Sequence, residues 1–303
     1  MQETILSAKN LTKKYGSFTA LENVDITVYK GDIFGLIGRN GAGKTTLLKI
    51  LSGLTNCTSG EYSVFSKSGE DLRKQRRRIG CLIEEPAFFK NMTARQNLKY
   101  YCLQKGITDL SQIDKVLETI SLTDSGNKKF KDFSMGMKQR LGIAFALLDN
   151  PDLVILDEPI NGIDPIAVSE LRDTFFRLNR EKEVTLIVSS HILSELYAIA
   201  NRFLIIDKGK VIKDLTKDEL DAECSLCTVL RTDNVNRAVT LLEDKLGVTE
   251  FDVTDKEEIR ITQPEIKPML ITKTLVENGI GVGAIYESGL SLEDYFKKIL
   301  SSN

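Results

Sequence analysis

An eight-residue motif constrains this chain more than any other feature of its sequence. Residues 38–45 read Gly-Arg-Asn-Gly-Ala-Gly-Lys-Thr, a complete G-x-x-x-x-G-K-[ST] pattern. The motif follows a strand-like segment, residues 32–37, and precedes a helical pattern from Lys44 through Leu51. Such a turn brings backbone N–H groups and a helix N-terminus against a phosphate group. We therefore interpret the motif as a phosphate-binding loop and not as a chance glycine-rich turn.

The loop predicts a site for the phosphate groups of a nucleotide together with Mg²⁺. Lys44 is expected to reach the β and γ phosphates, and the Thr45 hydroxyl is expected to ligate Mg²⁺. The glycines let the backbone approach an anion without a side-chain clash. The residues of this region expected to bind nucleotide are Gly38, Arg39, Asn40, Gly41, Ala42, Gly43, Lys44, Thr45 and Thr46.

Two carboxylates follow a second apolar strand. Residues 153–156 read Leu-Val-Ile-Leu and lead directly into Asp157 and Glu158. We expect Asp157 near the Mg²⁺ shell and Glu158 beside the γ-phosphate, where it can polarise the attacking water. Alternatively, the two carboxylates could cap a helix or form a solvated pair. The presence of a phosphate-binding loop in the same chain disfavours that alternative.

The length of 303 residues favours a main domain and a smaller one, which we place at residues 1–220 and 221–303. The first alternates β-rich runs with helical patterns, as in an α/β fold, and Lys208 lies in a turn between two antiparallel runs. Its expected strands are residues 5–8, 24–28, 32–37, 153–156, 184–188, 203–206 and 210–212. A further helical run is expected over residues 141–148.

The sequence pattern of residues 221–303 is typical of a compact α+β domain. We expect strands at residues 228–231, 250–253, 258–262 and 281–286, with helices at residues 235–246, 266–278 and from Ser291 onward. The resulting order, βαββαβ with an added helix, is that of a ferredoxin-like unit and names no activity by itself.

Composition narrows the functional class. The net charge is −2, and the dense basic run at residues 73–78 is short, so a solvated helix face is favoured and no nucleic-acid partner is expected. Five scattered cysteines, with one C-x-x-C at Cys224 and Cys227, indicate no disulfide framework and only weakly a metal site. No bilayer-spanning stretch or signal peptide is evident, so we expect a cytoplasmic protein.

The segment before the strand at residues 153–156 distinguishes among the many families of proteins that bind nucleotides through such a loop. Residues 133–140 read Phe-Ser-Met-Gly-Met-Lys-Gln-Arg, which resembles the signature of the ABC transporter family, usually Leu-Ser-Gly-Gly-Gln followed by Gln-Arg. The resemblance covers residues 4–215 and implies a P-loop NTPase cassette with a mixed sheet and a helical signature subdomain. It further implies a homodimer, in which Ser134, Met135, Gly136 and Met137 face the phosphates held by the second copy.

Other family elements occur in order. Tyr15 resembles the aromatic residue that stacks on adenine, and residues 161–165, with Asp164, resemble the D-loop at the dimer interface. His191, the only histidine, follows a strand and resembles the switch histidine that contacts the γ-phosphate, although alone it could be a buried structural residue.

Glu84 departs from the family pattern, which has glutamine at this place. Its carboxylate can still ligate Mg²⁺ or orient water, but it adds a negative charge beside the phosphates. The groove around Glu84, Pro86, Phe88 and Phe89 is the expected docking place for a helix of a membrane partner; exposed phenylalanines would support this, and core positions would not.

This glutamate, the form of the signature and the tail resemble the subgroup that exports bacitracin and confers immunity to lantibiotics. The resemblance implies an ATP-hydrolysing subunit, peripheral on the inner face of the membrane, that energises a separate integral membrane permease. The alternatives are a soluble ABC ATPase acting on DNA or ribosomes, and a nucleotide-dependent regulator without a membrane partner. The cargo is chosen mainly by the permease and is not readable here.

Overall fold

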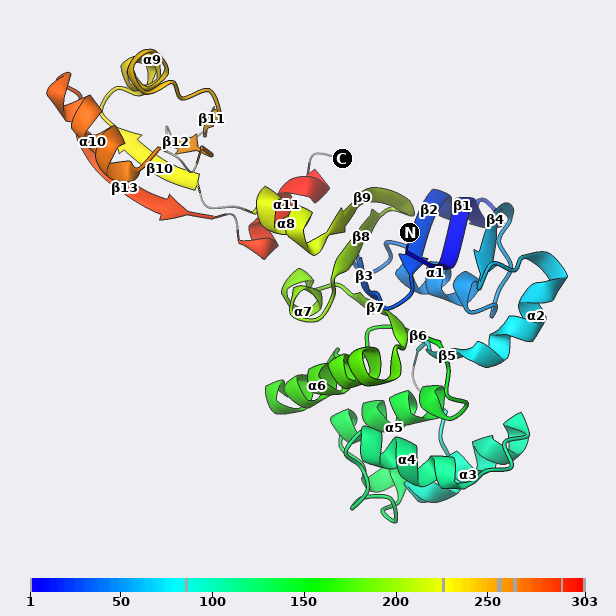
Figure 1. Cartoon of the computed structure of the whole chain (residues 1–303). Helices are drawn as coiled ribbons and strands as arrows, with labels where there is room; N and C mark the ends of the chain where they lie inside the picture. The colour runs from blue at the N-terminus through cyan, green and yellow to red at the C-terminus, as the bar shows by residue number, and fades with distance from the viewer. Residues whose placement is uncertain are drawn as a thin grey trace. The chain divides into compact units, whose positions relative to one another are not determined.

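The computed structural model describes residues 2–84, 87–224, 227–254, 258–263, 266–289 and 291–301. The chain divides into two compact units, Met1–Lys217 and Asp218–Asn303. The helix α8, Lys217–Glu223, begins at this division. Figure 1 shows the course of the chain through the units, which are described separately below.

A mixed six-stranded sheet forms the centre of the first unit. Its strand order is β5-β6-β7-β3-β8-β9, with all neighbours parallel except the antiparallel pair β8 and β9. The strands are β3 (Ile33–Ile37), β5 (Ile79–Leu82), β6 (Leu153–Leu156), β7 (Thr185–Ser190), β8 (Arg202–Asp207) and β9 (Lys210–Thr216). Their runs are apolar because the parallel strands are buried on both faces.

A second, antiparallel sheet has the order β2-β1-β4. Its strands are β1 (Thr4–Tyr15), β2 (Phe18–Tyr29) and β4 (Ser59–Val64). Helix α1 (Lys44–Leu51) packs in the core shared with the first sheet, where Leu47 and Leu48 are fully buried. The apolar face of α1 points into this core, whereas Thr45, Thr46 and Lys49 are partly exposed.

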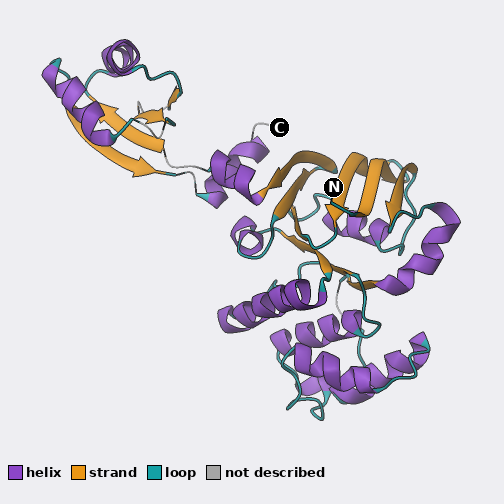
Figure 2. Ribbon diagram, in the orientation of Figure 1, coloured by secondary structure: helices purple, strands orange, loops and turns teal. Residues whose placement is uncertain are grey.

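Three of the remaining helices of this unit pack together, whereas α6 and α7 pack on strands of the central sheet. Helices α3, α4 and α5 pack on one another without an intervening strand (Figure 2). The helical elements are η1 (Gly69–Asp71), α2 (Leu72–Gln75), η2 (Arg76–Arg78), α3 (Ala94–Lys105), α4 (Ser111–Thr119), η3 (Phe130–Asp132), α5 (Met135–Leu147), α6 (Pro165–Lys182) and α7 (Leu193–Tyr197). The expected fold, a P-loop cassette with a mixed sheet and a helical subdomain, is confirmed.

Several expected bounds were wrong. Helix α5 begins at Met135 and not at residue 141, because the Ser134 side chain accepts a hydrogen bond from Met137 N and caps the helix. Strands β1 and β2 are each 12 residues long, far beyond the short runs expected. The basic run forms α2 and the turn η2 instead of one helix, with its cationic side chains exposed as expected.

The second unit contains an antiparallel sheet in the order β11-β12-β10-β13. Its elements are β10 (Cys227–Thr232), α9 (Val235–Leu246), β11 (Phe251–Val253), β12 (Glu258–Ile261), α10 (Pro268–Glu277), β13 (Val282–Ser288) and α11 (Leu292–Ser301). The βαββαβ order gives two interleaved crossover units, as expected for a ferredoxin-like domain. Leu230, Leu242, Ile259, Ile271 and Leu275 lie in its core.

Candidate nucleotide-binding and hydrolysis site

The loop between β3 and α1 has the conformation that its glycines permit. Gly41 and Gly43 have φ values of 82° and 107°, in the left-handed region. A Cβ on Gly43 would lie 2.8 Å from Ala20 O, and one on Gly38 would lie 2.4 Å from Ile206 O. The loop is therefore packed so closely against its neighbours that no larger residue fits at these positions.

This loop lines a cavity of about 300 Å³. Lys44 is buried at 5% exposure, and its ammonium donates to Gly38 O at 2.6 Å and to Arg39 O at 3.2 Å. The same nitrogen lies 3.1 Å from Glu158 Oε1. The lining residues are Phe18, Ala20, Arg39, Asn40, Gly41, Gly43, Lys44, Thr45, Thr46 and Glu158.

Asp157 lies at the carboxyl end of β6 and is held through both oxygens. Thr45 Oγ1 donates to Asp157 Oδ2 at 2.7 Å, and Ser189 Oγ donates to Asp157 Oδ1 at 2.6 Å. Hydroxyl and carboxylate oxygens are the ligands that Mg²⁺ prefers, and this ion usually takes its remaining ligands from water and phosphates. Two of the three side chains expected to ligate Mg²⁺, Thr45 and Asp157, therefore lie together and fit that ion.

Glu158, the next residue, lies between the loop and β7. Its φ is 47°, an uncommon value for a residue with a side chain, and its N–H donates to Ser189 Oγ at 2.8 Å. His191 Nδ1 lies 2.8 Å from Glu158 Oε2. The structure thus brings Lys44, Glu158 and His191 into one cluster, as the sequence predicts.

The signature residues lie outside this cavity and adjoin the D-loop. Ser134 is the N-cap of α5, and Met135 is 59% exposed. Gly136 is buried, and a Cβ there would lie 3.3 Å from Ile163. A Cβ on Gly162 would lie 3.3 Å from Met135 Cε, so the two segments pack together.

Asp164 ends the D-loop as the N-cap of α6. Its Oδ1 accepts a hydrogen bond from Ala167 N at 3.0 Å, and Pro165 occupies the first helical position. This cap fixes the direction in which the chain leaves the D-loop.

Two aromatic residues face each other across the turn between β1 and β2. Tyr15 pairs with Phe18 in the antiparallel register, and they are 49% and 64% exposed. Phe18 lines the cavity, whereas Tyr15 is not among its lining residues. Sequence reasoning missed Phe18, although an aromatic residue three positions after Tyr15 was a signal available for it.

Glu84 does not contact Thr45 or Asp157. Its Oε1 lies 2.5 Å from Lys49 Nζ, and Lys49 is one helical turn beyond Thr45 on α1. The carboxylate therefore lies beside the cavity's helix without lining the cavity.

Only one of the two phenylalanines at the expected docking groove is exposed. Pro86 lies outside the described residues. Phe88 belongs to the core, packed on Phe130 at 5.1 Å between ring centres, whereas Phe89 is 43% exposed and contacts Tyr100 edge to face.

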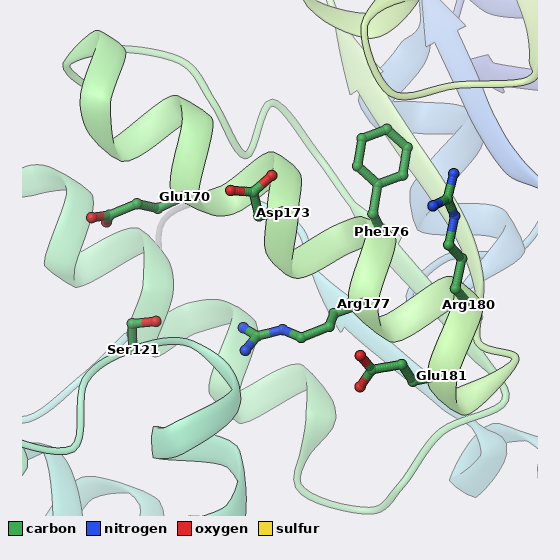
Figure 3. Close-up of a pocket in the computed structure, with 7 residues that line it drawn as sticks. All are labelled: Ser121, Glu170, Asp173, Phe176, Arg177, Arg180 and Glu181. Atoms are coloured by element: carbon green, nitrogen blue, oxygen red, sulfur yellow. The ribbon is translucent and has the colours of Figure 1, made fainter.

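A separate hollow of about 560 Å³ lies beside α6 (Figure 3). Arg177 Nη2 in this hollow donates to Thr119 O at 2.7 Å, and the guanidinium of Arg180 lies 5.5 Å from the ring centre of Phe176. The Arg177 bond joins α6 to the end of α4, whereas the Arg180 contact lies within α6. Its lining residues are Ser121, Glu170, Asp173, Phe176, Arg177, Arg180 and Glu181.

Comparison with known proteins agrees with this geometry. The family model described as ABC transporter matches residues 21–161. The chain is 41% identical to the bacitracin transport ATP-binding protein BcrA of Bacillus licheniformis, over 98% of this chain and 97% of that protein. The chain belongs to the ABC transporter family, as an ATP-binding protein. The family resemblance predicted from the signature is confirmed.

Further similarities locate the cassette within the chain. The lantibiotic transport ATP-binding protein SrtF of Streptococcus pyogenes is 43% identical over 71% of this chain and 92% of its own length. A solved dimeric structure of the ATP-binding cassette MJ0796, bound to ADP and Pi, has a TM-score of 0.64 and 26% identity, covering 70% of this chain and 99% of that cassette. This ABC cassette therefore binds and hydrolyses ATP.

In the described part of the chain, no helix has both the length and the apolarity needed to cross a membrane.

Proposed function

We propose that this ABC cassette energises a separate integral membrane permease that exports a peptide antibiotic, or another amphipathic compound, or confers immunity to it. The observation that carries the proposal is the full-length match to BcrA, a bacitracin transport protein, which extends through the C-terminal unit. The match to the lantibiotic transport protein SrtF supports the same class of cargo.

Nucleotide binding is assigned to the loop and the aromatic turn. Lys44 holds the β and γ phosphates of ATP, because its buried ammonium points into a loop of backbone carbonyls and N–H groups at a helix N-terminus. Thr45 and Asp157 hold Mg²⁺, which neutralises phosphate charge when bound. Tyr15 and Phe18 contact the base, since both rings are exposed at the edge of the loop.

Hydrolysis is assigned to Glu158 and His191. Glu158 accepts a proton from the attacking water, because its carboxylate lines the cavity beside Lys44. His191 fixes the orientation of that carboxylate through the 2.8 Å contact and lies near enough to meet the γ-phosphate.

The cassette acts as a homodimer. Ser134, Met135, Gly136 and Met137 line no part of the chain's own cavity. Ser134 and Met135 are exposed, so this segment is available to the phosphates held by a second copy. The N-terminus of α5 and the cap residue Ser134 suit an anion. Asp164 directs the adjoining D-loop along the same interface, and the dimeric MJ0796 cassette supports this assembly.

The permease docks on the surface formed by Phe89, Tyr100 and Leu103. Their side chains are 43%, 42% and 65% exposed, and the first two pack edge to face. An exposed apolar surface of this kind suits a cytoplasmic helix of a membrane protein. The cassette then lies on the inner face of the membrane, with residues 1–220 as the motor and 221–303 as an accessory domain.

The test is to capture partners of the tagged Glu158→Gln variant from detergent-solubilised native membranes in the presence of ATP. Mass spectrometry is expected to identify an integral membrane protein with several spans. Capture of ribosomal or DNA-bound proteins, together with measurable ATP hydrolysis by the wild type, would instead favour a soluble ATPase. Capture of no partner, together with barely measurable hydrolysis by the wild type, would favour a regulator.

A further inference from the structure

Ser189, near the end of β7, joins the two carboxylate residues of the site. Its side chain is fully buried at 0% exposure. Its hydroxyl accepts a hydrogen bond from Glu158 N at 2.8 Å and donates one to Asp157 Oδ1 at 2.6 Å. A serine hydroxyl has a single proton to donate, so this proton is committed to Asp157.

The two bonds have separate effects on the site. The bond to Oδ1 leaves Asp157 Oδ2 facing Thr45, at 2.7 Å, so the carboxylate cannot rotate without losing one of its partners. The bond from Glu158 N holds a residue whose φ of 47° is unfavourable for a side-chain-bearing residue and persists only when neighbouring groups fix it.

We propose that Ser189 is a positioning residue that orients Asp157 toward the metal ion and holds Glu158 in its left-handed conformation. This role rests on the proposed function of Thr45 and Asp157 as Mg²⁺ ligands. Ser189 touches neither nucleotide nor metal. Its effect on both is transmitted through the carboxylate, as for groups that hydrogen-bond to a metal's ligands and set the metal's affinity.

The neighbouring serine provides a matched control. Ser190 is equally buried, at 2% exposure, but its hydroxyl donates to Glu195 Oε2 at 2.9 Å and accepts from Ile192 N at 3.0 Å. It contacts neither carboxylate of the site through its side chain. Removing its hydroxyl therefore imposes a comparable loss of buried hydrogen bonds without releasing Asp157.

The experiment measures metal binding and not turnover. Full-length wild type, Ser189→Ala, Ser189→Cys and Ser190→Ala are each saturated with a non-hydrolysable ATP analogue, and Mn²⁺ binding is followed by electron paramagnetic resonance. Nucleotide affinity is measured separately in EDTA. Cysteine keeps the volume of serine but is a weak donor, so it separates the hydrogen bond from packing if the alanine variant does not fold.

In both Ser189 variants the Mn²⁺ midpoint is expected to rise about 10-fold, the lower end of the usual effect of losing such a partner, while affinity in EDTA stays within about two-fold. Ser190→Ala is expected to leave the midpoint unchanged. A wild-type midpoint in the folded Ser189 variants, or an equal rise in Ser190→Ala, would overturn the proposal. A wild type that binds no Mn²⁺ in its complex with the analogue would instead contradict the proposed metal site.

Discussion

His191 Nδ1 and Glu158 Oε2 lie 2.8 Å apart, and the other oxygen of Glu158 lies 3.1 Å from Lys44 Nζ. A single carboxylate thus links the end of β7 to the phosphate-binding loop. Because these two contacts join Lys44, Glu158 and His191, a substitution of any one of these residues is expected to change the orientation of the other two.

His191→Ala removes the group that orients Glu158. We expect the rate of ATP hydrolysis to fall about 10²- to 10³-fold, the usual effect of losing one aligned polar group, with ATP affinity nearly unchanged. Steady-state turnover and equilibrium binding of ATP measure the two quantities. A loss of binding as large as the loss of turnover would show that His191 is mainly structural.

Phe18→Ala and Tyr15→Ala test the aromatic turn. Each is expected to weaken ATP binding about 5- to 150-fold, since stacking on a base contributes about 1–3 kcal/mol per ring, while binding of tripolyphosphate stays unchanged. Phe18→Tyr retains a ring and serves as the control. Equal losses for ATP and tripolyphosphate would mean that the turn supports the loop instead of contacting the base.

Glu84→Gln removes the negative charge beside α1. We expect ATP affinity without metal to rise about 2- to 5-fold at low ionic strength, with the gain reduced at high salt, because exposed charges are screened. Lys49→Met, which leaves the Glu84 carboxylate without its partner, is expected to act in the opposite direction. Binding titrations at two salt concentrations would refute this account if both variants behave as the wild type.

Tyr295 connects α11 to α8 within the second unit through a 2.6 Å hydrogen bond from its hydroxyl to Glu223. Burial and this bond raise the pKa of Tyr295 far above its ordinary value of 10.0. The contribution of this hydrogen bond to the free energy of unfolding is therefore fully present below pH 10. It is lost as the pH rises above 10, because the tyrosine hydroxyl ionises at a lower pH in the unfolded chain than in the folded one.

Tyr295→Phe is accordingly expected to lower the free energy of unfolding by about 1 kcal/mol at pH 7. The difference from the wild type should shrink above pH 10, because the variant has no phenol to ionise at this position. Urea unfolding of the full chain, followed by circular dichroism at several pH values, measures it. A difference that does not change with pH would contradict the linkage to Tyr295.

The sequence was most informative where a residue type is dictated by backbone geometry. No residue larger than glycine fits in place of Gly38 or Gly43, because an added Cβ would lie within 2.8 Å of a backbone oxygen. The spacing from Gly38 to Thr45 follows from the shape of that loop. Asp157 and Glu158 were located because a buried parallel strand must end at the same sheet edge as β3.

Contacts between distant segments were harder to predict. The roles of Ser189 and Phe18 depend on partners far away in the chain, and neither residue type is diagnostic by itself. Phe88 and Phe89 are identical neighbours in sequence, yet one is buried and the other exposed. The start of α5 was missed because the cap Ser134 outweighs the weak helix propensity of Gly136.

The most direct test of the account is turnover of Mg²⁺-ATP by purified wild type and by Glu158→Gln, with ATP binding measured on the same samples. We predict steady hydrolysis by the wild type, a loss of at least about 10²-fold in the variant, and ATP affinity retained in both, with the variant forming an ATP-dependent dimer. Equal turnover by the two proteins, or none by either, would contradict the assignment of Glu158 as the catalytic base.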